Sequence, residues 1–234
     1  NVYPGAQIPF GGIQISPDTD SRFYDAASGY KYNHLTLMGF SLTHLSGTGI
    51  PDLGDFLFIP GTGEMKLEPG THEDPDQGYR SRYSHDKEWA SPNYYAVELA
   101  DYGVKAEMTS GVRSGMFRFT YPESDNAFIM IDMNHTLWQS CEWSNLRMIN
   151  DSTITGYKLE KGWGPERHVY FTATFSKKLT GLRFVQDKKP VIYNTSRFRS
   201  SYEAWGKNLM ACISFDTKAG EEVTVKTAIS AVST

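Results

Sequence analysis

The stretch HVYFTATFS, residues 168–176, alternates apolar and polar side chains with a period of two. Apolar side chains occupy every second position from Val169 to Phe175, so they all fall on one side of an extended chain. This alternation is typical of a β-strand that buries one face. We therefore predict a strand over these residues.

The same period recurs along the chain, and a helical period of 3.6 residues is nearly absent. Further strands are predicted at Gly12–Ser16, Asp55–Ile59, Tyr94–Ala100, Val104–Thr109, Gly115–Tyr121, Ala127–Met133, Leu209–Phe215 and Val223–Ser230. So many strands require at least two sheets. One short helix is expected over Ser200–Asn208.

Short turns separate several of these runs, at residues 101–103, 122–126 and 218–221. Such connections favour antiparallel neighbours, and the strands follow one another without crossover helices. The sequence therefore predicts an all-β fold, a large antiparallel β-sandwich. Because no repeat or linker interrupts residues 1–234, we expect one domain.

The amino-acid composition limits the classes of partner that the chain can bind. The chain has 234 residues, with 23 Lys and Arg against 27 Asp and Glu, and a net charge of −4. This balance argues against binding to duplex nucleic acid, which depends on phosphate neutralisation. No apolar run approaches the roughly 20 residues of a transmembrane helix. A neutral or weakly charged partner fits best, with no nucleic acid and no membrane span.

The two cysteines, Cys141 and Cys212, are too few for a disulfide scaffold and too far apart for a zinc motif. We expect two buried, unpaired thiols. The chain does not begin with Met, and it stops at residues 231–234 where a strand pattern still continues. A piece of a longer protein is therefore expected.

Two segments break the strand pattern. The first, Tyr3–Gly12, surrounds Phe10 with prolines and glycines, and the second, Gly39–Asp55, combines glycines, hydroxyls, an imidazole and two carboxylates. Such loops expose backbone N–H groups and short polar side chains, which suit the dense neutral hydrogen bonding of sugar hydroxyls. Ordinary turns, with Phe10 tucked into the core, are the alternative.

Three other features of the sequence each allow a functional and a structural interpretation. His44 has no second His at ligand spacing, so a hydrogen-bonded structural role is favoured over a metal ligand. The acidic runs at residues 18–20 and 72–76 lack the ordered spacing of a calcium loop, and solvated turns are expected there. A few aromatic side chains are candidates for stacking on a sugar ring, although each one alone is more typical of a core residue: Tyr24, Tyr30, Tyr32, Trp89 and Trp163.

Several long motifs resemble the N-terminal portion of glycoside hydrolase family 92, the calcium-dependent exo-acting α-mannosidases. They are VYPGAQIPFGGIQISPDT at residues 2–19, SGYKY at 28–32, GFSLTHLSGTG at 39–49 with DLGD at 52–55, and AEMTSGVRSGMFRFTYP at 106–122. The resemblance extends over the whole chain. The sequence departs from the family pattern at Leu42, at residues 50–51 and near residues 23–25, where a tryptophan is frequent.

The resemblance implies a two-domain enzyme with an N-terminal β-sandwich of the supersandwich, galactose-mutarotase-like type. A C-terminal (α/α)6 barrel would follow and would carry the general acid, the general base and the calcium. Hydrolysis would be inverting, of α-1,2 type, and directed at mannose-containing glycans. A bacterial enzyme in the periplasm, at the cell surface or secreted is implied.

On this resemblance we assign no catalytic residue and no metal ligand to the chain itself. The residues expected to contact substrate or the barrel are Phe10, Gly11, Tyr24, His44, Thr48, Gly49 and Asp52. Contact with the substrate and contact with the barrel alone both stay open. So do two other roles, a free-standing carbohydrate-binding β-sandwich without hydrolytic activity, and a domain that only folds and solubilises its partner.

Overall fold

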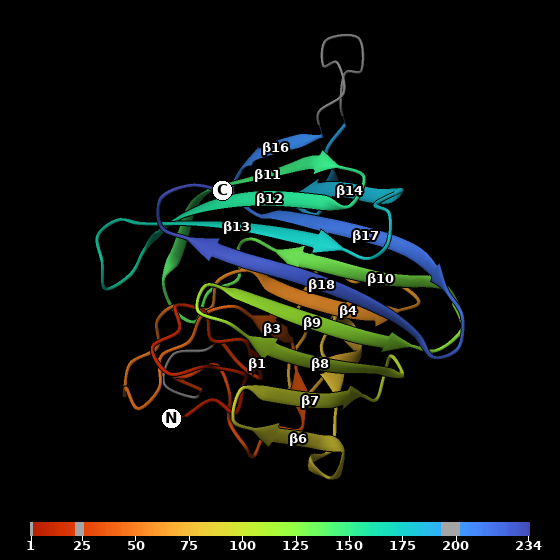
Figure 1. Ribbon diagram of the computed structural model, residues 1–234, viewed down its shortest axis with the longest axis horizontal. Coiled ribbons are helices and arrows are strands. Elements are labelled where there is room, and N and C mark those ends of the chain that lie inside the picture. The colour runs from red at the N-terminus through yellow and green to blue at the C-terminus, as the bar shows by residue number, and fades with distance from the viewer. Residues whose placement is uncertain (1, 22–25, 193–201) are drawn as a thin grey trace.

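The computed structural model describes residues 2–21, 26–192 and 202–234. Within these residues the strands form two large antiparallel sheets packed face to face, with a two-stranded sheet beside them (Figure 1). The predicted all-β antiparallel sandwich is confirmed. In the described part of the chain the helices are two short 3-10 turns, η1 (Pro75–Gln77) and η2 (His85–Lys87).

The strand order of each sheet mixes distant parts of the described chain. The nine-stranded sheet runs β16 (Glu203–Gly206), β11 (Ser140–Asn150), β12 (Thr153–Lys161), β13 (Arg167–Phe175), β18 (Glu221–Ser230), β9 (Ser114–Tyr121), β8 (Val104–Ser110), β7 (Tyr94–Leu99) and β6 (Glu88–Ser91). The seven-stranded sheet runs β1 (Ser16–Asp18), β3 (Gly39–Ser41), β4 (Leu57–Thr62), β10 (Ser124–Asp132), β17 (Leu209–Thr217), β14 (Gly181–Gln186) and β15 (Lys189–Pro190). The small sheet pairs β2 (Thr36–Leu37) with β5 (Ser81–Arg82).

The main core lies between the two large sheets and is rich in aromatic rings. Phe58 on β4 packs against Phe117 on β9 with ring centroids 4.8 Å apart, and Phe56 packs against Phe171 on β13 at 4.5 Å. Large flat rings of this kind bury more apolar surface than any other side chain. They fix the spacing of the two sheets and hold the residues that precede β4.

Strand β10 is apolar on both faces, which explains its uninterrupted hydrophobic sequence. Ile129 and Ile131 face the main core, whereas Phe128 and Met130 belong to a second buried cluster. Partly buried residues of the segment between β4 and β5, such as Leu67, pack against this second cluster. One face of the seven-stranded sheet is therefore covered by its own chain.

Some predicted boundaries are wrong. The strand expected over Gly12–Ser16 begins only at Ser16, because the backbone of Gly12 and Gln14 bonds to neighbouring loops instead. Strands β11, β12 and β14 were not predicted. In β12 the inward positions include Gly156, Lys158 and Glu160, so no apolar alternation marks this strand.

Two of the three predicted hairpins are also wrong. The turn at residues 101–103 joins the antiparallel neighbours β7 and β8 as expected. The connections at 122–126 and 218–221 instead carry the chain from one sheet to the other, since β9 pairs with β8 and β18 while β10 pairs with β4 and β17. A short link between stacked sheets has the same turn residues as a hairpin.

The helix expected over Ser200–Asn208 is absent from the described part of that range, residues 202–208. Residues 203–206 form β16, which pairs with β11 through Leu146 and Ala204. Tertiary pairing outweighs the weak helical preference here.

The two thiols are as predicted, since Cys141 and Cys212 are both buried and unpaired. Among the described residues, no helix has the length and hydrophobicity of a membrane span.

A charged cluster on the surface of the nine-stranded sheet gives a test of acid stability. Arg118 on β9 donates two hydrogen bonds, of 2.8 and 3.0 Å, to Glu107 on β8. These bonds hold the pKa of Glu107 at about 2, below its ordinary 4.5. A lowered pKa in the folded state stabilises the fold above pH 4.5, and this contribution is lost as the pH falls toward 2.

We therefore expect Glu107→Gln to lose less stability than the unsubstituted chain as the pH falls through that range. Urea unfolding at a series of pH values measures the difference. Parallel pH curves for the two proteins would contradict the assignment.

Candidate functional site

The two glycine-rich segments of the sequence meet at one end of the sandwich. Gln14 joins them, because its side chain donates to the backbone oxygen of Gly11 at 2.7 Å and its own backbone oxygen lies 2.7 Å from His44 Nδ1. The backbone N–H of Gly12 in turn donates to Val112 in the turn between β8 and β9. The predicted residues Gly11 and His44 are thus brought together. This end of the molecule, formed by residues 5–14, 42–56, 110–114 and 162–166, is called the loop edge below.

The 42–56 loop closes on itself at its base. The Thr43 hydroxyl donates to Asp55 Oδ2 at 2.5 Å, and the backbone N–H of Asp55 donates back to the same hydroxyl at 3.1 Å. Leu42 and Gly54 complete the stem with backbone bonds to Asp55 and Thr43. The base of the loop is therefore fixed even though its sequence is rich in glycine.

Asp55 also belongs to a buried group of four charges. Arg167 at the start of β13 donates to both of its oxygens, at 3.0 and 2.6 Å, and also to Glu160 at 2.6 Å. Lys158 lies 2.5 Å from Glu160 and 3.6 Å from Asp55. Burial would raise the pKa of Asp55, but Lys158 and Arg167 hold it below its ordinary value. Two cations and two carboxylates thus anchor the loop to the nine-stranded sheet.

A second buried network fixes His44. Its Nε2 lies 2.8 Å from Asp18 Oδ1, and His135 Nε2 lies 2.8 Å from the other oxygen of Asp18. The backbone oxygen of Gln14 lies 2.7 Å from the other ring nitrogen of His44, Nδ1. Burial alone would raise the pKa of Asp18, but His44 and His135 keep it below its ordinary value. The arrangement orients the His44 ring through both of its nitrogens, and it holds the ring buried at 3% exposure.

This network corrects one prediction. The run at residues 18–20 was expected to be a solvated turn, yet the structure buries both of its carboxylates, with Asp18 at 0% and Asp20 at 3% exposure. Asp18 is the last residue of β1, and the pairing of β1 with β3 places it beneath the loops. Its partner His135 is 117 residues away in the sequence.

The tip of the 42–56 loop is open. Thr48 is partly exposed and Gly49 is exposed, and a Cβ added at Gly49 would meet no atom within 4 Å. The tip is held mainly by a local bond from the Thr48 hydroxyl to Ile50. A rigid base with an open tip is an arrangement that can contact a separate molecule or domain.

Phe10 is the most exposed aromatic residue of the loop edge. Its side chain is 101% exposed, so the alternative in which it tucks into the core is wrong. Its backbone has a φ of 60°, a left-handed conformation that is strained for a bulky residue. Leu53 and Phe56 of the other loop share this positive φ. Strain of this kind concentrates at functional segments.

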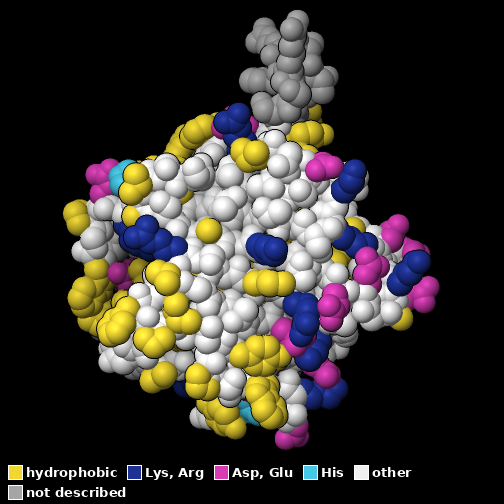
Figure 2. All heavy atoms as spheres, in the orientation of Figure 1, with side chains coloured by type: hydrophobic (Ala, Val, Ile, Leu, Met, Phe, Trp, Pro, Cys, Tyr) yellow, Lys and Arg dark blue, Asp and Glu magenta, His cyan; other side chains and the backbone are white. Residues whose placement is uncertain are grey.

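The hairpin between β12 and β13 adds Trp163, which is 66% exposed. Partly buried Asp52 lies against this hairpin, since a Cβ on Gly162 would come within 2.9 Å of its carboxylate. Figure 2 shows hydrophobic side chains gathered on the left of the view, where Figure 1 places these loops. The loop edge therefore combines exposed apolar rings with small polar groups.

Two hollows flank the Asp18 network. One, of about 480 Å³, is lined by Gln14, His44 and Arg167 of the loop edge. The other, of about 740 Å³, is lined by His135, Asp132 and Trp138 on the far side. The carboxyl group of Asp132, which lines this second hollow, has a raised pKa because it is buried. His44 faces the first hollow and His135 the second, with Asp18 between them.

The remaining predicted residues fall into separate environments. Tyr24 lies outside the described residues. Of the other stacking candidates, Tyr30 is buried at 8% exposure, whereas Tyr32 and Trp89 are exposed at 64% and 67%. Sequence reasoning did not single out Asp18, His135 or Arg167 for this site. No short-range motif marks them, because their partners are distant in the chain.

Calcium does not fit the described residues. The described group that offers three or more His, Cys or carboxylate ligands close together is Asp20, His34 and His72. Two of these ligands are imidazoles, whereas calcium requires six to eight oxygen atoms.

Comparison with known proteins agrees with this fold. Residues 1–230 match the model of the glycosyl hydrolase family 92 N-terminal domain. No curated protein is similar enough to this chain to count as a match.

Two solved structures share the architecture. The family 92 glycosyl hydrolase ccman5 superposes with a TM-score of 0.81 at 23% identity, covering 100% of this chain and 31% of that protein. The family 92 inverting mannosidase BT2199 from Bacteroides thetaiotaomicron VPI-5482 superposes with a TM-score of 0.78 at 23% identity, covering 99% of this chain. This chain spans 29% of that second protein. The matched sequence and the shared sandwich show that the chain belongs to the glycosyl hydrolase family 92 N-terminal domain family.

Proposed function

We propose that this chain is the non-catalytic N-terminal part of an inverting exo-α-mannosidase that removes α-1,2-linked mannose from glycans. Membership of family 92 supports this proposal, as does the similarity to a protein named an inverting mannosidase. In this proposal the general acid, the general base and a calcium ion belong to a C-terminal (α/α)6 domain. The enzyme acts in the periplasm or at the surface of a bacterium, or is secreted.

The observation that carries the proposal is the contrast within the loop edge. Buried charges fix its base through Asp55 and Asp18, while Phe10 and Gly49 are exposed at its tip. A domain that only stabilised itself would have no need to hold an aromatic ring outward on a strained backbone. We infer that these loops pack on the catalytic domain and line its substrate pocket.

The chemistry available here is binding rather than proton transfer. Inverting hydrolysis needs a carboxylic acid and a base-activated water on opposite sides of the glycosidic bond. Asp18 and Asp55 are buried and bonded to His44 and Arg167 of this chain. Both ring nitrogens of His44 are also engaged by partners within the chain. What remains for a sugar is the ring of Phe10 for stacking, together with the Thr48 hydroxyl and the backbone of Gly49 for hydrogen bonds.

The proposal is tested first with the chain alone. The purified chain is expected to leave α-1,2-mannobiose intact, whereas the full-length enzyme cleaves it, with release of mannose as the measurement. Hydrolysis by the chain alone would overturn the proposal. Saturable binding of mannose or manno-oligosaccharides by the chain, with no activity in the full-length protein, would favour the free-standing carbohydrate-binding module instead.

A substitution at the loop tip tests the pocket role. Because a Cβ at Gly49 meets open space, Gly49→Leu is expected to leave the stability of the chain within about 0.5 kcal/mol. In the full-length enzyme the added side chain is expected to lower kcat/KM about 10-fold or more by obstructing the pocket.

Thr180→Leu, at an exposed position outside the loop edge, is the matched control and is expected to leave kcat/KM unchanged. Equal activity of Gly49→Leu and Thr180→Leu would remove the loop tip from the pocket.

A further inference from the structure

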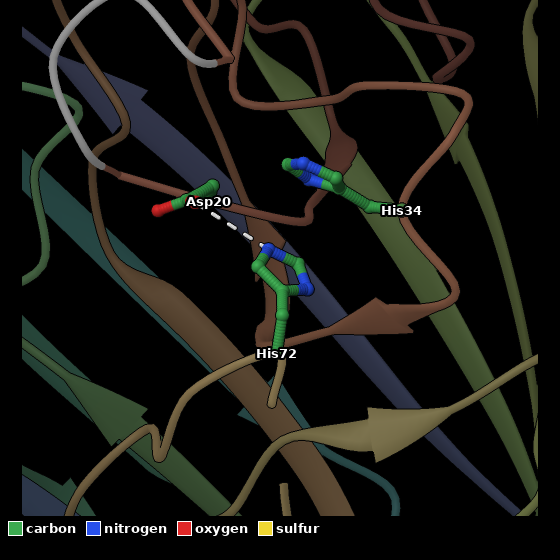
Figure 3. A group of neighbouring side chains, drawn as sticks. All are labelled: Asp20, His34 and His72. Carbon is green, nitrogen blue, oxygen red and sulfur yellow. Dashed lines mark ion pairs between the residues drawn. The ribbon is translucent and has the colours of Figure 1, made fainter. Parts of the chain in front are cut away.

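A cluster of two histidines and one aspartate lies beside β1, apart from the residues assigned to the loop edge. Asp20 follows β1, His34 precedes β2, and His72 belongs to the segment between β4 and β5. One ligand atom of each residue lies within 4.8 Å of the ligand atoms of the other two. Figure 3 shows the three side chains converging from these three segments. The Asp20 and His72 side chains are 4% and 16% exposed, so the cluster is largely shielded from water.

A hydrogen bond to Thr19 positions the His34 ring beside the cluster. Its Nδ1 lies 3.0 Å from the Thr19 hydroxyl. That hydroxyl donates its hydrogen to the backbone oxygen of Gly29 and accepts one from the backbone N–H of Lys31. These contacts hold the His34 ring in place within the cluster. A metal ion requires the lone pair of a ring nitrogen, which the neutral imidazole supplies.

His72 is oriented in a comparable way. Its Nδ1 lies 2.8 Å from the Thr36 hydroxyl, and its Nε2 lies 3.4 Å from Asp20 Oδ2. Two atoms that ligate the same zinc ion at about 2.0–2.1 Å sit about 3.3 Å apart in a tetrahedral site. The Asp20–His72 pair already has this spacing. His34 lies beside it, with its ring centroid 4.0 Å from that of His72.

Arg80 brings a positive charge next to this cluster. Its Nη1 lies 3.5 Å from each ring nitrogen of His72. It is held there by the backbone oxygen of Thr19 at 2.6 Å and by the Thr36 hydroxyl. Its charge lowers the affinity for a cation, and the Asp20 carboxylate opposes that effect.

We propose that Asp20, His34 and His72 bind one divalent zinc-type metal ion. Imidazole nitrogen with a single carboxylate suits zinc and its neighbours in the first transition row, and the oxygen-poor ligand set excludes calcium. The ion would tie three segments together: the end of β1, the approach to β2 and the segment that covers the seven-stranded sheet. Its role is structural, since a metal that binds only the folded state stabilises that state.

Zinc binding to the protein, first freed of metal with a chelator, tests the proposal. We expect one equivalent of Zn²⁺ to bind and the melting temperature to rise by several degrees at saturating Zn²⁺. Titration calorimetry measures the stoichiometry, and thermal unfolding with and without Zn²⁺ measures the shift. Failure of the unsubstituted protein to bind Zn²⁺ would overturn the proposal.

Matched histidine variants locate the site. His72→Gln and His34→Gln are expected to weaken Zn²⁺ binding about 30-fold or more and to abolish the rise in melting temperature. His168→Gln, an exposed residue on β13 that pairs with Glu166, should bind Zn²⁺ as the unsubstituted protein does. Undiminished binding in both cluster variants would overturn the assignment. If a variant fails to fold, loss of binding in Asp20→Asn, with the His168→Gln response unchanged, decides in its place.

Discussion

Replacing Lys158 by Met lowers the free energy of unfolding by about 3 to 5 kcal/mol. Lys158 is fully buried between Asp55 and Glu160, which are 0% and 1% exposed. Burial would lower the pKa of Lys158, but the two carboxylates hold it above its ordinary value, so the group is charged. Without it, two buried carboxylates share the single cation of Arg167. An uncompensated buried charge is among the most costly changes a core can undergo.

The substitution also affects the loop edge, because Lys158 donates to the backbone of His135 at 2.7 Å and Asp55 closes the 42–56 loop. Urea unfolding followed by fluorescence measures the loss. Lys161→Met, at an exposed position on the same strand, is the control and should change stability by no more than about 0.5 kcal/mol. Similar unfolding midpoints for the two variants would show that the buried charges do not stabilise the loop.

Replacing Phe10 by Ala lowers kcat/KM of the full-length enzyme about 30-fold or more while leaving the stability of this chain nearly unchanged. Phe10 is fully exposed, so its removal costs the isolated fold no buried surface. An aromatic anchor that becomes buried on contact with another surface typically contributes about 2 kcal/mol or more, which corresponds to that fold-change. The prediction rests on the proposed role of the loop edge.

The measurement is mannose release at limiting substrate, paired with thermal unfolding of the isolated chain. Phe10→Trp retains a flat ring and is expected to recover most of the activity. Trp205→Ala removes another aromatic ring of the surface, which is 54% exposed on β16 and away from the loop edge, and should leave kcat/KM unchanged. Full activity in Phe10→Ala would show that this ring meets neither substrate nor the catalytic domain.

The fold class follows from the sequence because alternation is a local property. Strands such as β13 can be recognised in the sequence because every second residue is apolar, which gives the strand one continuous apolar face. Strand β12 cannot, since its inward positions include Lys158 and Glu160. These two charges pair with each other and with the distant residues Asp55 and Arg167. The sequence also does not show which strands belong to the same sheet. The links at 122–126 and 218–221 consist of turn residues that serve equally well in a hairpin within one sheet and in a connection between two sheets.

The candidate site was predictable only in part. The glycine-rich segments drew attention to Gly11 and His44, and the structure joins them through Gln14. Asp18 and His135 could not be foreseen, because a contact between residues 117 positions apart leaves no periodic trace in a single sequence. The buried state of Asp20 was missed for the same reason, since burial depends on what packs over a strand end.

The positions of β17 and β18 carry a consequence for biosynthesis. Although they come last among the described strands, β17 lies between β10 and β14 in one sheet, and β18 lies between β13 and β9 in the other. Each sheet is therefore divided until these final strands are translated and inserted. Domains governed by such distant pairings fold slowly and expose unpaired strand edges meanwhile. On the ribosome, the nascent chain has to remain unaggregated until about residue 230 has left the exit tunnel.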